Sequence, residues 1–182
     1  MILPTTADDT GGFCMPCKNG IRNSIEESKE YYARERELDK TCPFRALWSD
    51  LVDRVYKTDT GFDSLTDSEK LYYAVSVLSG EVYNGGFVQY FDNSSGEHYL
   101  IAEKGLKTLN ATNSLNFLQQ AKRASFGNKP VPVDRAERYQ IIRNAGADDV
   151  LNNLDNEFYK DLDGLDSKLE EFAVKMKLVE SA

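Results

Sequence analysis

The sequence predicts an all-α fold, a single-domain helical bundle of about seven to nine helices. Apolar residues recur every three or four positions along most of the chain, which is the period of helices that face a core. Three segments open with the residue spacing of a helix cap, whereas alternating runs of Val, Ile or Thr, which indicate strands, are nearly absent. At 182 residues the chain is long enough to bury such a core without a metal or a disulfide.

We expect the chain to divide near residue 40, into an N-terminal extension (residues 1–40) and a helical domain (residues 41–182). Residues 1–18 lack periodicity and predict a loop. A charged helix follows, and the spacing of Ser24 and Glu27 places its start at a capping box. Pro43 ends this helix, because proline disfavours helical backbone in the residue before it.

Six further helical segments follow in order. The first covers residues 44–56, and the second, residues 66–82, opens with a capping box of Thr66 and Glu69. Apolar stripes predict helices over residues 100–109 and 115–126, and Asp134 with Glu137 starts another near residue 134. The most regular stripe runs from residue 151 to 176, where Gly164 predicts two short helices or one kinked helix.

The charge balance narrows the class of partner. The chain carries 30 acidic and 22 basic residues, a net charge of −8. This balance disfavours a nucleic-acid-binding surface, because phosphates are met by Lys and Arg, and it favours basic partners or simply solubility. No apolar run approaches the ~20 residues needed to cross a bilayer, and the first residues do not resemble an export signal. We therefore expect a cytoplasmic protein.

The acidic excess is concentrated near the C-terminus. Between residues 148 and 171 nine carboxylates face two lysines, Lys160 and Lys168, so this segment nets −7. Their spacings of three, four or seven place carboxylates along helix faces, away from the Leu and Phe stripe. We expect an acidic, partner-binding face; the alternative is an ordinary solvated face. The nine residues are Asp148, Asp149, Asp155, Glu157, Asp161, Asp163, Asp166, Glu170 and Glu171.

Candidate metal and catalytic residues are few. Cys14 and Cys17 have the C-x-x-C spacing of half a zinc site, which Cys42 and His98 would have to complete. The alternative is that the cysteines are ordinary thiols. His98 is the chain's only histidine, and the neighbouring serines lack the G-x-S-x-G elbow of a nucleophile. We therefore predict no catalytic residue and no cofactor, with zinc as the one alternative.

A stretch rich in glycine and aromatic residues lies in the middle of the chain. We interpret it as mainly structural: the glycines allow unusual backbone angles or close approaches, and the aromatics at i, i+3 and i+4 fill the core. Ser94 or Ser95 would then cap the following helix, and Gln89 and Asn84 would hydrogen-bond the turn. The stretch contains Asn84, Gly85, Gly86, Phe87, Gln89, Tyr90, Phe91, Asn93, Ser94 and Gly96.

This stretch resembles the signature of the DNA mimic protein 19-like family, a group of small acidic helical bacterial proteins. The resemblance extends over residues 44–172 and includes the run from Leu154 to Tyr159. It implies an all-helical fold, a capacity to form a homodimer and no enzymatic activity. It also implies an acidic surface that imitates duplex DNA and occupies a DNA-binding protein.

We therefore expect a non-enzymatic acidic interaction protein that mimics DNA and blocks a basic DNA-binding or nucleic-acid-acting partner, without contacting nucleic acid or a membrane. Two alternatives remain. One is an immunity-type inhibitor of a specific toxin, which would use the same acidic surface. The other is a small zinc-binding module or an uncharacterised enzyme that uses the cysteines.

Overall fold

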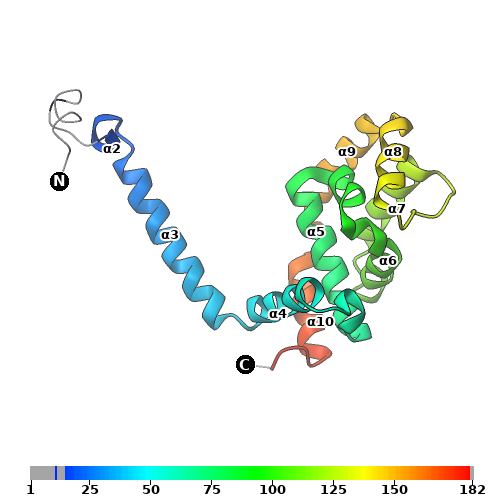
Figure 1. Cartoon of the computed structure of the whole chain (residues 1–182), viewed down its shortest axis with the longest axis horizontal. Helices are drawn as coiled ribbons and strands as arrows, with labels where there is room; N and C mark the ends of the chain where they lie inside the picture. Colours follow the sequence, from blue (N-terminus) through cyan, green and yellow to red (C-terminus); the bar gives the residue numbers. More distant parts are fainter. Residues whose placement is uncertain (1–10, 12–14, 181–182) are drawn as a thin grey trace. The chain divides into compact units, whose positions relative to one another are not determined.

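The computed structural model describes residue 11 and residues 15–180, and every regular element in that part of the chain is a helix (Figure 1). This confirms the predicted all-α class. The chain packs as two units, residues 1–46 and residues 47–182.

The described residues of the first unit form mainly one long helix. It contains α2 (Met15–Lys18), α3 (Arg22–Thr41) and the first turn of α4 (Pro43–Lys57). No residue of α3 is buried. The guanidinium of Arg45 binds Glu35 at 2.9 Å and Asp39 at 2.8 Å, which ties the start of α4 to the end of α3.

The two ends of α3 compare differently with the predictions. The helix ends at Thr41, directly before Cys42 and Pro43, as predicted. Its predicted start at Ser24 is wrong, because α3 begins at Arg22 and has no side-chain cap. Ser24 lies inside the helix, where its carbonyl accepts a hydrogen bond from the hydroxyl of Ser28.

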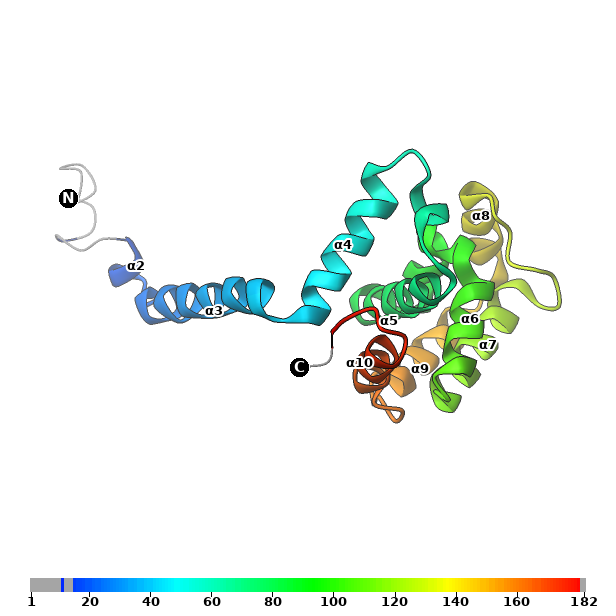
Figure 2. The same ribbon diagram turned by 90° about the horizontal axis from the view of Figure 1, so that it is seen from below.

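The second unit surrounds one central helix, α5 (Asp67–Asp92), which contacts η2, α6, α8, α9 and α10 (Figure 2). The short element η1 (Gly61–Ser64) precedes α5. The remaining elements are η2 (Ser94–His98), α6 (Tyr99–Thr108), α7 (Thr112–Phe126), α8 (Arg135–Ala145), α9 (Asp148–Phe158) and α10 (Leu165–Lys175).

Two of the predicted helix starts are confirmed. At α5 the hydroxyl of Thr66 accepts from the N–H of Glu69, and the Glu69 carboxylate accepts from the N–H of Thr66. At α8 the carboxylate of Asp134 accepts from the N–H of Glu137 at 2.7 Å. Gly164 lies between α9 and α10, so of the two predicted alternatives the structure has two short helices.

The core lies along α5, and its neighbours contribute one apolar side chain every three or four residues. Most members of the predicted stripes are buried, but Leu100 is 72% exposed and Trp48 stacks on Tyr73 near the surface. Fully buried apolar side chains include Leu51, Val75, Leu78, Val82, Phe87, Phe91, Leu106, Leu118 and Leu151. Among the described helices, none combines the length and apolar character of a membrane span.

Candidate functional site

The central helix bends at the glycine pair. Gly85 has φ −161° and ψ 25°, and Gly86 has φ 75° and ψ −178°, so neither is helical. The angles of Gly86 belong to a region that other residues rarely adopt. Because helical bonding is interrupted there, the N–H of Phe87 needs an acceptor outside its own helix. The carboxylate of Asp155 in α9 accepts this hydrogen bond at 2.8 Å.

Asp155 fits directly against the bend. A Cβ atom added to Gly86 would lie 2.2 Å from Asp155 Oδ2, so only glycine allows the carboxylate to approach this closely. Asp155 is 8% exposed. Its burial raises the pKa of the carboxyl, although the hydrogen bond from Phe87 opposes this change.

The placement of Asp155 on the exposed acidic face is therefore wrong. Its helical spacing relative to Asp148 is compatible with a shared face, but its partner at the bend lies 68 residues away in the sequence. Local periodicity carries no information about such a contact. Asp155 joins α9 to α5 instead of facing solvent.

The aromatic residues after the bend fill the core, as interpreted from their spacing. Phe87, Tyr90 and Phe91 are each at most 1% exposed. Phe87 packs edge-on against Phe158 of α9 with ring centroids 5.6 Å apart, and Phe91 packs similarly against Phe126 of α7 at 5.1 Å. This half of α5 therefore holds α7 and α9 together.

The polar residues of the signature hold the end of α5. The side-chain amides of Gln89 and Asn93 both donate to the Glu81 carboxylate, at 2.6 and 2.8 Å. The expected cap of the next helix is wrong: the hydroxyl of Ser95 donates back to the carbonyl of Tyr90, and α6 has no side-chain cap. Both Asn84 and Ser94 are exposed.

Sequence reasoning missed Arg138, a fully buried arginine in α8. It donates to the carbonyls of Phe91 and Asn93 at 2.8 and 2.7 Å. Two further carbonyls, those of residues 132 and 133, accept at 2.9 and 2.6 Å. Arg138 lies four residues before the buried Ile142, on the apolar side of α8, and this spacing could have indicated that Arg138 is buried. A Cβ atom added to Gly96 would lie 2.9 Å from Arg138 Nε, which explains this glycine of the signature.

Six of the nine predicted acidic residues are exposed on or beside α9 and α10. They are Asp148, Asp149, Asp161, Asp166, Glu170 and Glu171. None of them belongs to an ion pair with another described residue. Asp148 and Asp149 lie in the first turn of α9, and the other four residues follow that helix in the sequence. We call these six exposed residues the acidic face. Glu157 is partly buried and pairs with Lys160 at 2.5 Å.

Asp163, the ninth residue, points toward α7. Its carboxylate accepts from the N–H and the hydroxyl of Ser114, at 2.7 and 2.8 Å, and from the side-chain amide of Asn113 at 3.0 Å. Burial by itself would raise the pKa of Asp163, but these hydrogen bonds outweigh it and hold the pKa below its ordinary value. Asp163 thus caps the N-terminus of α7 and, like Asp155, is a structural residue.

The predicted zinc ligands are not gathered within the part of the chain that the structure describes. Cys14 lies outside the described residues. Cys17 and Cys42 belong to the first unit, and the Cys17 sulfur accepts from Arg22 at 3.2 Å. His98 belongs to the second unit, where its ring stacks on Phe62 at 3.8 Å. The described residues contain no group of three or more side chains able to hold a metal ion.

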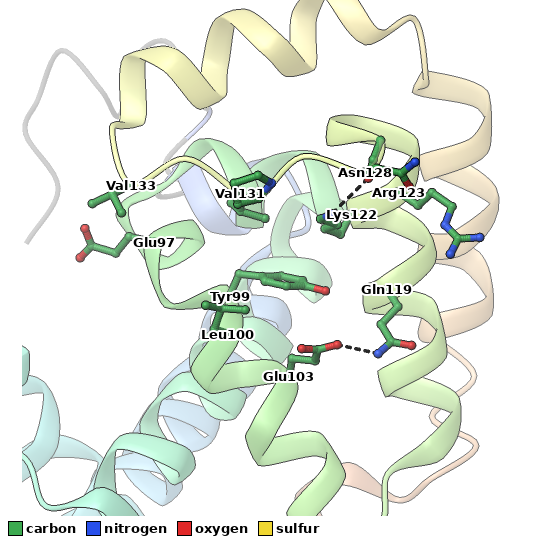
Figure 3. A pocket seen from close by; sticks show the side chains of 12 residues that line it. Glu97, Tyr99, Leu100, Glu103, Gln119, Lys122, Arg123, Asn128, Val131 and Val133 are labelled. Atoms are coloured by element: carbon green, nitrogen blue, oxygen red, sulfur yellow. Dashed lines mark hydrogen bonds between the residues drawn. The ribbon is translucent and has the colours of Figure 1, made fainter.

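A pocket of about 670 Å³ lies between α6, α7 and the turn that follows α7 (Figure 3). Figure 3 shows Tyr99 and Glu103 of α6 facing Gln119 and Lys122 of α7. The polar groups engage one another: Glu103 accepts from Gln119 at 2.6 Å, and Lys122 donates to the carbonyl of Gly127 at 3.1 Å. Burial, with Glu103 nearby, raises the pKa of Tyr99 to about 12. A tyrosine with a raised pKa is less readily ionised, so Tyr99 is not activated as a nucleophile.

Together, a bent central helix and a solvent-facing group of carboxylates define a small acidic all-helical protein. The chain belongs to the DMP19-like protein family, whose family model matches residues 63–176. This match begins within η1, ends beyond α10, and includes both the signature and the acidic face. No curated protein and no solved structure gave a significant match to the chain.

Proposed function

We propose that this chain is a non-enzymatic interaction protein whose acidic face imitates the charge of duplex DNA and occupies a basic protein that binds or acts on nucleic acid. The observation that carries the proposal is the acidic face itself, six exposed carboxylates without an ion pair among the described residues. The family match supports it, because the resemblance implies DNA mimicry.

The charge distribution also supports the proposal. The second unit carries 22 acidic and 15 basic residues. When the 9 acidic and 2 basic residues of segment 148–171 are set aside, 13 of each sign remain. The charge excess of the unit thus lies in this one segment, and a general need for solubility would not require such a concentration.

Binding through this face has a specific electrostatic signature. Asp166 and Glu170 lie one helical turn apart, about 6 Å along the axis, whereas duplex DNA carries one charge per ~1.7 Å. The carboxylates of the acidic face are therefore spaced more widely than the charges of DNA. They attract a cationic partner at low salt, and this attraction is screened in ~1 M salt, where the Debye length is about 3 Å. The partner should also release the chain when duplex DNA is added, because both ligands occupy the same basic surface.

The test is a competition experiment with a matched pair of variants. The chain is immobilised, basic proteins from the native lysate are captured at low salt, and elution by salt and by duplex DNA is compared. The variant Asp166→Asn/Glu170→Gln/Glu171→Gln should capture much less of the partner. The control Asp50→Asn/Asp53→Asn/Asp59→Asn changes the net charge equally, on α4 and the turn after it, and should retain binding.

Two results would contradict the proposal. Capture that resists both high salt and duplex DNA would show that the partner does not use a DNA-binding surface. Equal loss of binding in the two triple variants would show that net charge matters and that the acidic face does not.

A further inference from the structure

Two tyrosine rings are stacked and exposed beside the acidic face. Tyr83 of α5 and Tyr159, directly after α9, have ring centroids 5.6 Å apart and an interplanar angle of 24°. They are 49% and 42% exposed. Large exposed aromatic residues are typical of binding surfaces, where a rigid ring supplies contact area at little entropic cost.

Contacts with neighbouring residues hold the two tyrosine rings in place. The hydroxyl of Tyr159 donates to the carbonyl of Val82 at 3.1 Å, and the ring of Tyr83 packs edge-on against the buried Phe158 at 5.8 Å. Tyr83 lies two residues before the glycine bend, and Tyr159 lies four residues after Asp155, the residue that binds the bend. The contact between α5 and α9 therefore sets the positions of both rings before any partner arrives.

Two carboxylates act on Tyr83. Burial raises the pKa of Tyr83, and the negative charges of Asp161 and Asp166 add to this effect, which places both carboxylates within electrostatic reach of its hydroxyl. Leu162, between them in the sequence, is 60% exposed. No arginine or lysine among the described residues lies over either ring, whereas Tyr31, Phe62 and Tyr139 each have such a cation.

We propose that the exposed, stacked pair Tyr83–Tyr159, together with the nearby residues Asp161 and Asp166, is a binding site for an arginine side chain of the basic partner. The inference rests on the proposed function, since it names the side chain by which the partner is held. A guanidinium is planar, so it lies flat on an aromatic face while its N–H groups reach a carboxylate. An ammonium is more strongly hydrated and makes this stacked contact less well.

The test compares two peptides of equal length, one of arginine only and one of lysine only, in titrations against the full chain. We expect the arginine peptide to bind about two- to fivefold more tightly, the gain typical of an exposed cation–π contact. Tyr83→Leu should abolish this preference while leaving weaker binding of both peptides. Tyr56→Leu, which alters an exposed tyrosine of α4, should retain the preference.

A second measurement needs no variant. In the wild-type chain, the ring-proton NMR signals of Tyr83 and Tyr159 should move on addition of the arginine peptide and much less with the lysine peptide. Equal affinity for the two peptides, a preference that survives Tyr83→Leu, or unmoved ring signals would overturn the inference. If the arginine site is overturned but both peptides bind the variant Asp166→Asn/Glu170→Gln/Glu171→Gln more weakly than wild type, the proposed role of the acidic face is retained. If neither peptide depends on those carboxylates, the proposed function fails as well.

Discussion

At the scale of single residues, two aspartates with the same helical spacing as their exposed neighbours make contributions to stability that depend on pH in opposite directions. Asp155 has a raised pKa, so its ionised form is disfavoured in the folded chain and its contribution to stability falls as the pH rises above the ordinary 3.8. Asp163 has a lowered pKa, so its contribution is present above 3.8 and is lost as the pH falls below that value. Sequence spacing does not distinguish the two.

The glycine bend gives a prediction at the same scale. Gly86→Ala places a methyl group against the Asp155 carboxylate and forces a left-handed backbone angle on a residue with a side chain. We expect the free energy of unfolding to fall by about 2 to 5 kcal/mol, the sum of backbone strain and overpacking. Chemical denaturation of both proteins measures this difference.

The control is a glycine of the same helix. Gly80 has an ordinary backbone, and a Cβ atom added there would meet nothing within 4 Å. Gly80→Ala should therefore stabilise the chain by about 0.5 to 1 kcal/mol. A Gly86→Ala variant as stable as Gly80→Ala would show that the contact between Gly86 and Asp155 does not form.

At the scale of helices, the sequence predicted those helix ends that are fixed by contacts between residues close together in the chain. The starts of α5 and α8 were predicted because Thr66 and Asp134 cap residues three positions ahead. The cap of α7 could not be predicted, because Asp163 binds it from 49 residues away. For the same reason, helical spacing did not separate Asp155 and Asp163, which bind distant parts of the chain, from the exposed carboxylates of the acidic face.

The cap of α7 can be tested through its pH dependence. Asp163→Asn replaces one acceptor oxygen with a donor facing Ser114, so the variant should lose about 1 to 2 kcal/mol of stability at neutral pH. The difference from wild type should shrink as the pH falls below 3.8, since the unfolded wild-type chain then takes up a proton that the folded chain excludes. Urea denaturation at a series of pH values measures it. A difference that does not change with pH would show that the Asp163 charge does not hold α7.

At the scale of the whole molecule, the two units differ in what stabilises them. The second unit has a core around α5, whereas α3 buries no residue and carries many charges of both signs. A single helix without tertiary packing is marginal in water. The all-α class and the position of the charge excess were predictable, because both follow from composition and period. The unusual backbone at Gly85 and Gly86 was predictable from the glycine pair, but the contact with Asp155 that fixes the bend of α5 was not.

This difference predicts where a protease cuts first. Trypsin should cleave within residues 22–41, which contain several exposed Lys and Arg residues, and leave a resistant fragment that includes residues 47–180. Mass spectrometry of a time course identifies the sites. Initial cleavage inside α5 or α9 would contradict the division into a loosely held helix and a packed unit.

The bend also constrains how the family can diverge. A substitution at either Gly86 or Asp155 disrupts the contact between them. A larger residue at position 86 displaces the Asp155 carboxylate, and a shorter residue at position 155 leaves the N–H of Phe87 without an acceptor. Members of the family should therefore either retain both Gly86 and Asp155 or replace both, even where the exposed acidic residues differ.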